Sequence, residues 1–362
     1  MHRFFRRAQL FCLGIIAFVA LNCAAYFAAP VLIPIVLALL ASFVLRPLHK
    51  KVSSLGLGDG WASLVVILLI SGALAWGFYG LVQPARNWIS KMPDNIKLVE
   101  KKVRGYLRPM KEIQMAAQQV ENITNPESLD GRAPVKESSV ASSVVLATGS
   151  LVKTAAVALL LVLFFLAFGS ELFHSLTRQW EGARKLGSIG DSISQYMATI
   201  TVINFTLGAA QALALWAMGM PNPLLWGLMA ALLTYIPYVG AMVGTLIVAG
   251  VSLISFDSPN HALLVPAVYA ILVSLEGGLI TPIILGKRFK INPLVISIFL
   301  LWLGWLWGII GALVAVPILV MFKVVCEQFE FLQPLGAIIC HEDSCTVAAA
   351  PPQEKSDLRT TQ

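Results

Sequence analysis

A single acidic residue, Glu276, interrupts an otherwise uncharged apolar stretch from Ala262 to Leu285. In an α-helix it would lie roughly 15 Å from the basic residue Lys287, because each residue advances a helix by about 1.5 Å. That distance is about half the thickness of a bilayer, where an ionised side chain costs about 2.5 to 3.5 kcal/mol on insertion scales. Glu276 therefore either binds a proton or a substrate, or is a protonated side chain that caps the backbone opened by the two following glycines and Pro282.

Two other apolar stretches are interrupted near their middle by residues that break helices. Residues 223–256 contain Ile-Pro-Tyr-Val-Gly at 236–240, and residues 293–322 contain Gly-Trp-Leu-Trp-Gly-Ile-Ile-Gly at 304–311. A broken helix is tolerated in a membrane only where it is buried or lines a cavity, and paired breaks of this kind indicate the substrate site of a transporter. The pathway residues predicted at the breaks are Pro237, Tyr238, Gly240, Gly308 and Gly311.

Other polar and aromatic residues accompany these breaks. Asn204 and Gln211 lie on one face of a predicted helix over 198–218, where amides either hydrogen-bond neighbouring helices or bind a ligand. The aromatic residues at the breaks either anchor the protein at the membrane interface or line the pathway. They are Tyr235, Tyr238, Trp302, Trp305 and Trp307.

The composition predicts which elements position these residues. The chain has 362 residues, of which 57% are hydrophobic and 12% charged, with a formal net charge of +7. Soluble domains carry about 25% charged residues, so a soluble single-domain enzyme is excluded. Residues 8–45, 192–256 and 291–322 hold no charged side chain, and a membrane-spanning helix needs about 20 apolar residues. The fold class is therefore an all-α, polytopic helical membrane protein, and not a membrane barrel with alternating polar positions.

The apolar segments predict about six full spans and two broken-helix hairpins, which makes eight hydrophobic segments. The spans lie at 8–29, 30–45, 61–82, 150–168, 198–218 and 262–285. The N-terminus also resembles a signal peptide, but basic clusters on both sides of residues 8–45 favour two uncleaved spans. If residues 223–256 form a hairpin entered from outside, the basic residues 287, 288 and 290 fall inside, as do both termini.

The second hairpin is expected to enter from the opposite side of the membrane. Asn222 and Asn292 each begin an Asn-Pro-Leu triplet before a broken segment, which suggests an inverted repeat. The predicted parts of the chain are three spans over 1–83, an extracytoplasmic amphipathic helical segment over 84–143, and a fourth span with a cytoplasmic connector over 144–196. A transport core follows over 197–325, and a flexible cytoplasmic tail over 326–362. Helical spacing of apolar residues in the 84–143 segment indicates either packed amphipathic helices or a ligand-binding part.

Enzyme signatures are missing from the sequence. It contains no phosphate loop, no His-Glu-x-x-His motif and no Gly-x-Ser-x-Gly elbow. Cys340 and Cys345 flank one histidine, but this spacing is too loose for a metal site. We therefore predict no cofactor, no metal, no nucleic-acid partner and no enzymatic activity.

The chain resembles the autoinducer-2 exporter family of bacterial membrane proteins. The likeness is strongest over about residues 219–323 and covers the whole chain more loosely. It rests on Ile-Pro-Tyr-Val-Gly at 236–240, Glu-Gly at 276–277, Leu-Ile-Thr-Pro at 279–282, Leu-Gly-Lys-Arg at 285–288, Asn-Pro at 292–293, Trp-Gly at 307–308, Gly-Ala at 311–312 and Ala-Val-Pro at 315–317.

This resemblance implies an inner-membrane exporter of a small signalling molecule, or a sodium-proton antiporter, assembled as a homo-oligomer. It adds Thr281, Pro282 and Asn292 to the candidate site. The chain has Gly278 and Thr234 where asparagine is common in the family, so it lacks two amides near the expected site. The sequence thus predicts a secondary transporter, with Glu276 as the proton-coupling residue and lipid and a small solute or ion as partners. A non-transporting scaffold and an intramembrane enzyme are the alternatives.

Overall fold

The computed structural model describes residues 2–91, 98, 99, 102, 154–169, 183–286, 291–329 and 336. The labelled elements are α1 (His2–Phe27), α2 (Ala29–Ser53), α3 (Asp59–Ser90), α6 (Ala183–Ala217), α7 (Pro223–Leu233), α8 (Val239–Ser255), α9 (Pro259–Leu275), the π-helical turn η1 (Glu276–Ile280), α10 (Thr281–Leu285) and α11 (Pro293–Gln328). A further apolar helix covers Thr154–Gly169.

The predicted fold class is confirmed, because five helices in the described ranges are long and apolar enough to cross a membrane. They are Ala29–Ser53, Asp59–Ser90, Ile189–Ala217, Pro259–Leu285 and Pro293–Glu327. The shorter apolar helices include Cys12–Phe27 and Thr154–Gly169, so each predicted apolar segment corresponds to a helix. The predicted connector before the fifth span differs in one respect, because α6 begins at Ala183 and continues into the span. Most of the 84–143 segment, the basic residues at 287–290 and most of the tail lie outside the described ranges.

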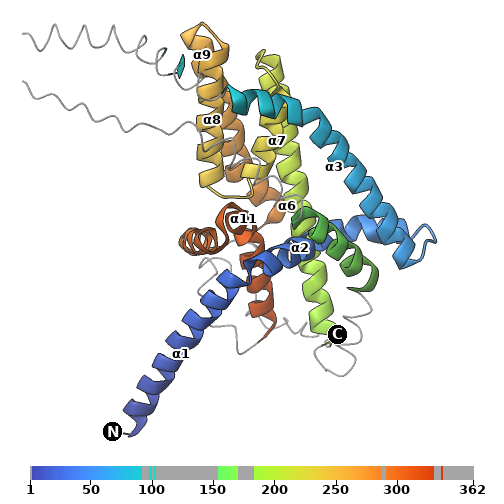
Figure 1. Cartoon of the computed structure of the whole chain (residues 1–362), viewed down its shortest axis with the longest axis vertical. Helices are drawn as coiled ribbons and strands as arrows, with labels where there is room; N and C mark the ends of the chain where they lie inside the picture. Colours follow the sequence, from blue (N-terminus) through green and yellow to red (C-terminus); the bar gives the residue numbers. More distant parts are fainter. Residues whose placement is uncertain are drawn as a thin grey trace, which may run out of the picture.

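Helix α6 runs through the middle of the bundle (Figure 1). Its C-terminal half packs against α7 and α9, and its N-terminal half packs against α2, α10 and α11. Glycines allow α6 and α7 to approach closely: a Cβ added to Gly208 would lie 2.7 Å from the carbonyl oxygen of Gly227 and 2.8 Å from the Ala231 Cβ. Small residues at such an interface bring helix backbones into van der Waals contact, which is the main source of helix association in lipid.

The first broken segment folds back on itself as a hairpin. Helix α7 ends at Leu233, α8 begins at Val239, and Tyr238 between them has φ of 60°. The turn satisfies its own backbone, since the Gly240 N–H donates to the Ile236 carbonyl at 2.9 Å. The His261 side chain at the start of α9 bonds the Met218 carbonyl after α6 at 3.0 Å, so both ends of this hairpin lie at one end of the bundle.

The second broken segment is α11, which bends sharply at Gly308. Gly308 has φ of 66° and ψ of −146°, a conformation that favours glycine. Across the bend, a Cβ added to Gly304 would lie 3.8 Å from the Ala312 Cβ, and one added to Gly311 would collide with the Leu303 carbonyl. Ile291 before α11 and Val324 near its end belong to one apolar cluster, so this segment also returns toward its starting point.

The tips of the two hairpins meet inside the protein. Ile236 from the first tip packs in one cluster with Leu303, Leu306 and Ala315 from the second. Helix α1 covers the outer side of the second tip, where the Trp302 indole donates to the Asn22 side chain at 2.8 Å. The opposed hairpins that the sequence predicts are therefore present as two folded-back segments whose tips are in contact.

The tip glycines generate a prediction about stability. A Cβ on Gly240 would collide with the Leu233 carbonyl, and one on Gly311 with the Leu303 carbonyl. We expect Gly240→Ala and Gly311→Ala each to lower the free energy of unfolding by about 1 to 3 kcal/mol or more, because a carbonyl in a tight turn cannot move aside. The loss would appear as lower thermal stability in detergent and lower abundance in the membrane.

Gly250, in the same helix as Gly240, is the matched control. It has open space around its Cβ position, so Gly250→Ala should leave stability unchanged or raise it by about 0.5 to 1 kcal/mol through better helix propensity. Equal stability of the Gly240→Ala and Gly250→Ala proteins would show that the tip is not tightly packed.

Candidate functional site

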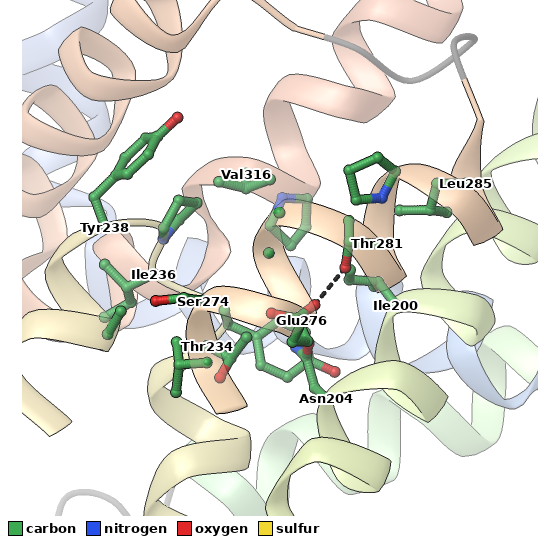
Figure 2. Close-up of a pocket in the computed structure, with 18 of the residues that line it drawn as sticks. Ile200, Asn204, Thr234, Ile236, Tyr238, Ser274, Glu276, Thr281, Leu285 and Val316 are labelled. Carbon is green, nitrogen blue, oxygen red and sulfur yellow. Dashed lines mark hydrogen bonds between the residues drawn. The ribbon is translucent and has the colours of Figure 1, made fainter. Parts of the chain in front are cut away.

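A cavity of about 620 Å³ lies where the first hairpin tip, α6, the α9–η1–α10 segment and the return limb of α11 meet (Figure 2). Its described lining comes from residues distant in sequence, from Tyr196 on α6 to Pro317 on α11. This size is within the range of about 300 to 1,000 Å³ typical of small-molecule sites. Most of the lining is apolar, and Glu276 is the only carboxylate among the described lining residues.

Glu276 is held in the cavity wall by an unusual helical turn. The span that began as α9 widens into a π-helical turn at Glu276–Ile280, before α10 resumes the α-helix. Pro282 explains the widening, because its ring would clash with the carbonyl four residues earlier in a regular α-helix. Such π-helical turns are frequent at functional sites. The turn leaves the Glu276 side chain only 5% exposed, and its Oε1 accepts a hydrogen bond from the Thr281 hydroxyl (Figure 2).

The facing wall of the cavity is α6, which contributes Asn204. This side chain is fully buried, and it lies beside the Tyr235 hydroxyl, with which it interacts. The Tyr235 hydroxyl nearby is shared with the Thr201 hydroxyl at 2.8 Å.

Five of the nine predicted site residues line this cavity. Pro237, Tyr238, Glu276, Thr281 and Pro282 are brought together from the first tip and the π-helical segment. Tyr238 lies at the rim with 63% of its surface exposed, and Figure 2 shows its ring directed away from the carboxyl of Glu276. Its positive φ in a non-glycine residue is a strained conformation, which costs about 1 to 3 kcal/mol and commonly occurs at functional sites.

The other four predicted residues shape the tips without lining the described cavity. Gly240 and Gly311 lie where one backbone crosses another, and Gly308 supplies the bend. Asn292 caps α11, because its Oδ1 accepts from the Leu294 N–H at 2.9 Å. The sequence pattern predicted that these residues line the pathway. In the structure they instead allow close backbone approach, a bend or a helix cap.

The sequence did not decide whether the aromatic and amide residues line the pathway or serve packing, and the structure shows both cases. Tyr235 lines the cavity, whereas the indoles of Trp302 and Trp307 donate to α1, the latter to the Ala25 carbonyl at 3.1 Å. Gln211 binds helices together, since its Nε2 donates to the Tyr269 carbonyl at 3.0 Å. Asn204 and Gln211 thus share a helix, but only Asn204 lines the cavity.

Sequence reasoning missed several lining residues. They are Tyr196, Ile200 and Ser274, together with Thr234, Val316 and Pro317, which were noted only in the comparison with a family pattern. Ser274 could have been found, because it lies within one turn of Glu276 on the same helix. Tyr196 and Ile200 on α6 carry no such signal, since only packing brings them to the cavity. The described residues hold no group of three or more His, Cys, Asp or Glu side chains that could bind a metal ion.

Comparison with known proteins places this architecture in a family. Residues 15–331 match the family described as AI-2E family transporter. The chain is 25% identical to YrrI of Bacillus subtilis (strain 168) over 317 residues, covering 83% of this chain and 86% of YrrI. It is 24% identical to the AI-2 transport protein TqsA of Escherichia coli (strain K12) over 328 residues, covering 89% of this chain and 92% of TqsA. With most of its length matched, including both hairpins and the Glu276 segment, the chain belongs to the AI-2E transporter family.

Proposed function

We propose that the protein is a secondary transporter of the inner membrane that exports a small polar molecule and uses the proton gradient through Glu276. One observation carries the proposal: a buried carboxyl with a single hydroxyl donor faces a cavity built where two broken-helix hairpins meet. An ionised carboxyl is costly in such a place. Either a bound proton or a bound cargo molecule would remove that cost, so the two would be linked at Glu276. The similarity to TqsA, named as an AI-2 transport protein, supports AI-2 as a candidate cargo.

The transport step follows from the arrangement of the cavity walls. One wall is α6 and the others are the hairpin tips and the π-helical segment, which contact each other through small apolar clusters. Movement of the hairpins against α6 would open the cavity to one side and then to the other, as in transporters built from opposed repeats. A protonated Glu276 would cross between the two states without the cost of a buried charge, and an ionised Glu276 would require a positive or hydrogen-bonding cargo.

A sodium-proton antiporter is the second candidate. The oxygens of Glu276 and Thr281, which are already in contact, are the kind of ligands that a hard cation prefers. The two candidates differ in the species that is exchanged for protons, so the same preparation distinguishes them.

The proton-coupling role predicts the behaviour of Glu276→Gln. The amide is nearly isosteric and can still bond Thr281, so the variant should fold and insert normally. Efflux of AI-2 from proteoliposomes should lose its dependence on an imposed pH gradient, because the amide does not exchange a proton. Flux of radioactive sodium, measured in parallel, tests the antiporter.

Asp257→Asn serves as the matched control for the loss of a carboxylate. Asp257 is exposed at the α8–α9 turn, where it pairs with Lys102 at 3.2 Å, away from the cavity. This variant should retain the pH dependence of the unmodified protein. If Glu276→Gln also retains both flux and pH dependence, Glu276 is structural.

The orientation in the membrane is part of the proposal. At the N-terminal end of α6, Arg46 and Lys50 pair with Asp191 at 3.7 and 3.0 Å, and basic residues favour the cytoplasm. At the other end, Lys102 from the predicted outer segment contacts the Phe256 carbonyl at 3.0 Å. We therefore place the α2–α3 turn and both termini in the cytoplasm, and the α8–α9 turn outside.

Single cysteines test this orientation on a background without the native cysteines. We expect Ser258→Cys, in the exposed α8–α9 turn, to react with a membrane-impermeant thiol reagent in intact cells. Ser54→Cys, in the α2–α3 turn, should react only after permeabilisation. Labelling of both residues from the same side would overturn the topology.

We also propose that the protein functions as a homo-oligomer. Helix α1 extends away from the bundle (Figure 1), and its apolar side chains are exposed, among them Leu13, Ile16, Leu21 and Phe27. Because lipid alone can also cover such a surface, the test of the proposal is the mass of the solubilised protein. Light scattering of the detergent-solubilised chain should give a multiple of the monomer mass of 39.1 kDa, whereas a monomer mass would refute it.

A further inference from the structure

A buried lysine near the end of α11 has no part in the proposed proton coupling. Lys323 is 1% exposed, and no other lysine or arginine is buried among the residues whose burial the structure describes. A lysine near the end of a membrane span normally extends its amine to water. Lys323 instead keeps its amine inside the protein, where Nζ lies 3.6 Å from Oε1 of Glu327, about one turn further along the helix.

An apolar cluster lies between the cavity and the end of the bundle that holds Lys323. Tyr196 of α6 and Val316 of α11 belong both to the cavity wall and to this cluster. From the cavity the cluster continues along the same two helices to Ile189 and Val324, and we call it the inner cluster. Tyr196 and Ile189 are about two turns apart, so the inner cluster is roughly 10 Å deep.

The inner cluster lies on the side of the cavity that faces the cytoplasm in the proposed orientation. The N-terminal half of α6 and the return limb of α11 lie side by side there (Figure 1). Asp191, whose pairs with Arg46 and Lys50 mark the proposed cytoplasmic end, is in the same turn of α6 as Ile189. The direct path from the cavity to the cytoplasm therefore runs between α6 and α11 through the inner cluster.

A buried ion pair is a poor device for holding such a cluster closed. Taking two charges out of water commonly costs more than their attraction returns, so apolar residues of similar volume are often as stable or more stable. The balance reverses when water enters, because both groups regain their hydration. Glu327 already reaches the surface, with 30% of its side chain exposed. Compared with apolar side chains, Lys323 and Glu327 therefore favour the hydrated state of the inner cluster.

We propose that the inner cluster is the cytoplasmic gate of the cavity, and that the Lys323–Glu327 pair sets the balance between its closed and hydrated states. The gate is closed in this structure, with Lys323 buried. It opens when the return limb of α11 separates from α6 and water reaches the amine. Lys323 does not line the cavity, so it is a positioning residue that acts on transport through the gate. This inference rests on the proposed transport function.

A buried reporter thiol in the full-length protein tests the gate in proteoliposomes. Ile193→Cys, on a background without the native cysteines, places the thiol in the inner cluster on α6, where the isoleucine is 2% exposed. N-ethylmaleimide is uncharged and reacts with the thiolate, so its rate of modification reports how often water reaches this position. Lys323→Met should lower that rate about tenfold or more, which corresponds to about 1.4 kcal/mol at 25 °C.

Glu327→Gln should have the opposite effect, because it leaves a buried ammonium without this carboxylate. The modification rate should rise about tenfold or more, and the midpoint of thermal unfolding should fall. Lys323→Met should leave the midpoint equal or higher, whereas an ion pair that only stabilises the fold would lower it in both variants. Lys323→Met should also slow the efflux of whichever solute the unmodified protein carries, AI-2 or sodium.

The double variant Lys323→Met/Glu327→Gln separates gating from a direct effect of charge on the thiol. If Glu327→Gln acts by leaving the amine without its carboxylate, the double variant should react as slowly as Lys323→Met. If the charges only change the reactivity of the thiol, the two effects should cancel. Lys50→Met is the matched control, because its pair with Asp191 at the same end of the bundle is exposed and contributes little. Its modification rate should equal that of the unmodified protein.

A modification rate for Lys323→Met at or above that of the unmodified protein would overturn the proposal, as would cancellation in the double variant. The rate is measured without cargo, so it is independent of the proposed function. Efflux of AI-2 or sodium with unchanged modification rates would refute the gate and leave the transport function standing. The expected changes in rate without flux of either solute would support the opening of the inner cluster and refute the transport function.

Discussion

A membrane offers no water to backbone groups, and the structure depends on how this protein meets that constraint at its two broken helices. The first tip forms its own turn hydrogen bonds between α7 and α8, and the second bends at Gly308 inside α11. Each tip is then covered by the other, through the cluster around Ile236 and Leu303. The two interruptions therefore bury each other inside the protein, and the cavity forms beside the place where they meet.

Close backbone approach is what makes this pairing possible. Gly208 and Gly227 bring α6 and α7 together, while Gly240 and Gly311 allow each hairpin to close around its tip. In lipid there is little hydrophobic gain from joining apolar helices, so van der Waals contact between small residues decides which helices associate. The same contacts hold Tyr238 at a positive φ, which a loosely packed tip would release.

The cavity concentrates the polar chemistry of an apolar protein on two opposed walls. Glu276 owes its position to a π-helical turn before Pro282, and Asn204 to the packing of α6 against the hairpin. The first side chain can change charge and the second cannot, so the two walls differ in chemistry as well as in origin.

Composition and local pattern were enough to predict a polytopic helical membrane protein, the two breaks, and Glu276 as an intramembrane acid. These properties depend on the solvent around each segment and on local backbone chemistry, which a sequence records directly. The partners of the breaks depend on contacts between residues far apart in the chain. The tertiary structure decided that Gly240 and Gly311 serve close packing, that Asn292 caps a helix, and that Asn204, unlike Gln211, faces a cavity. Two amides on one helix look alike in sequence, because only the neighbouring helices determine which of them lines a cavity.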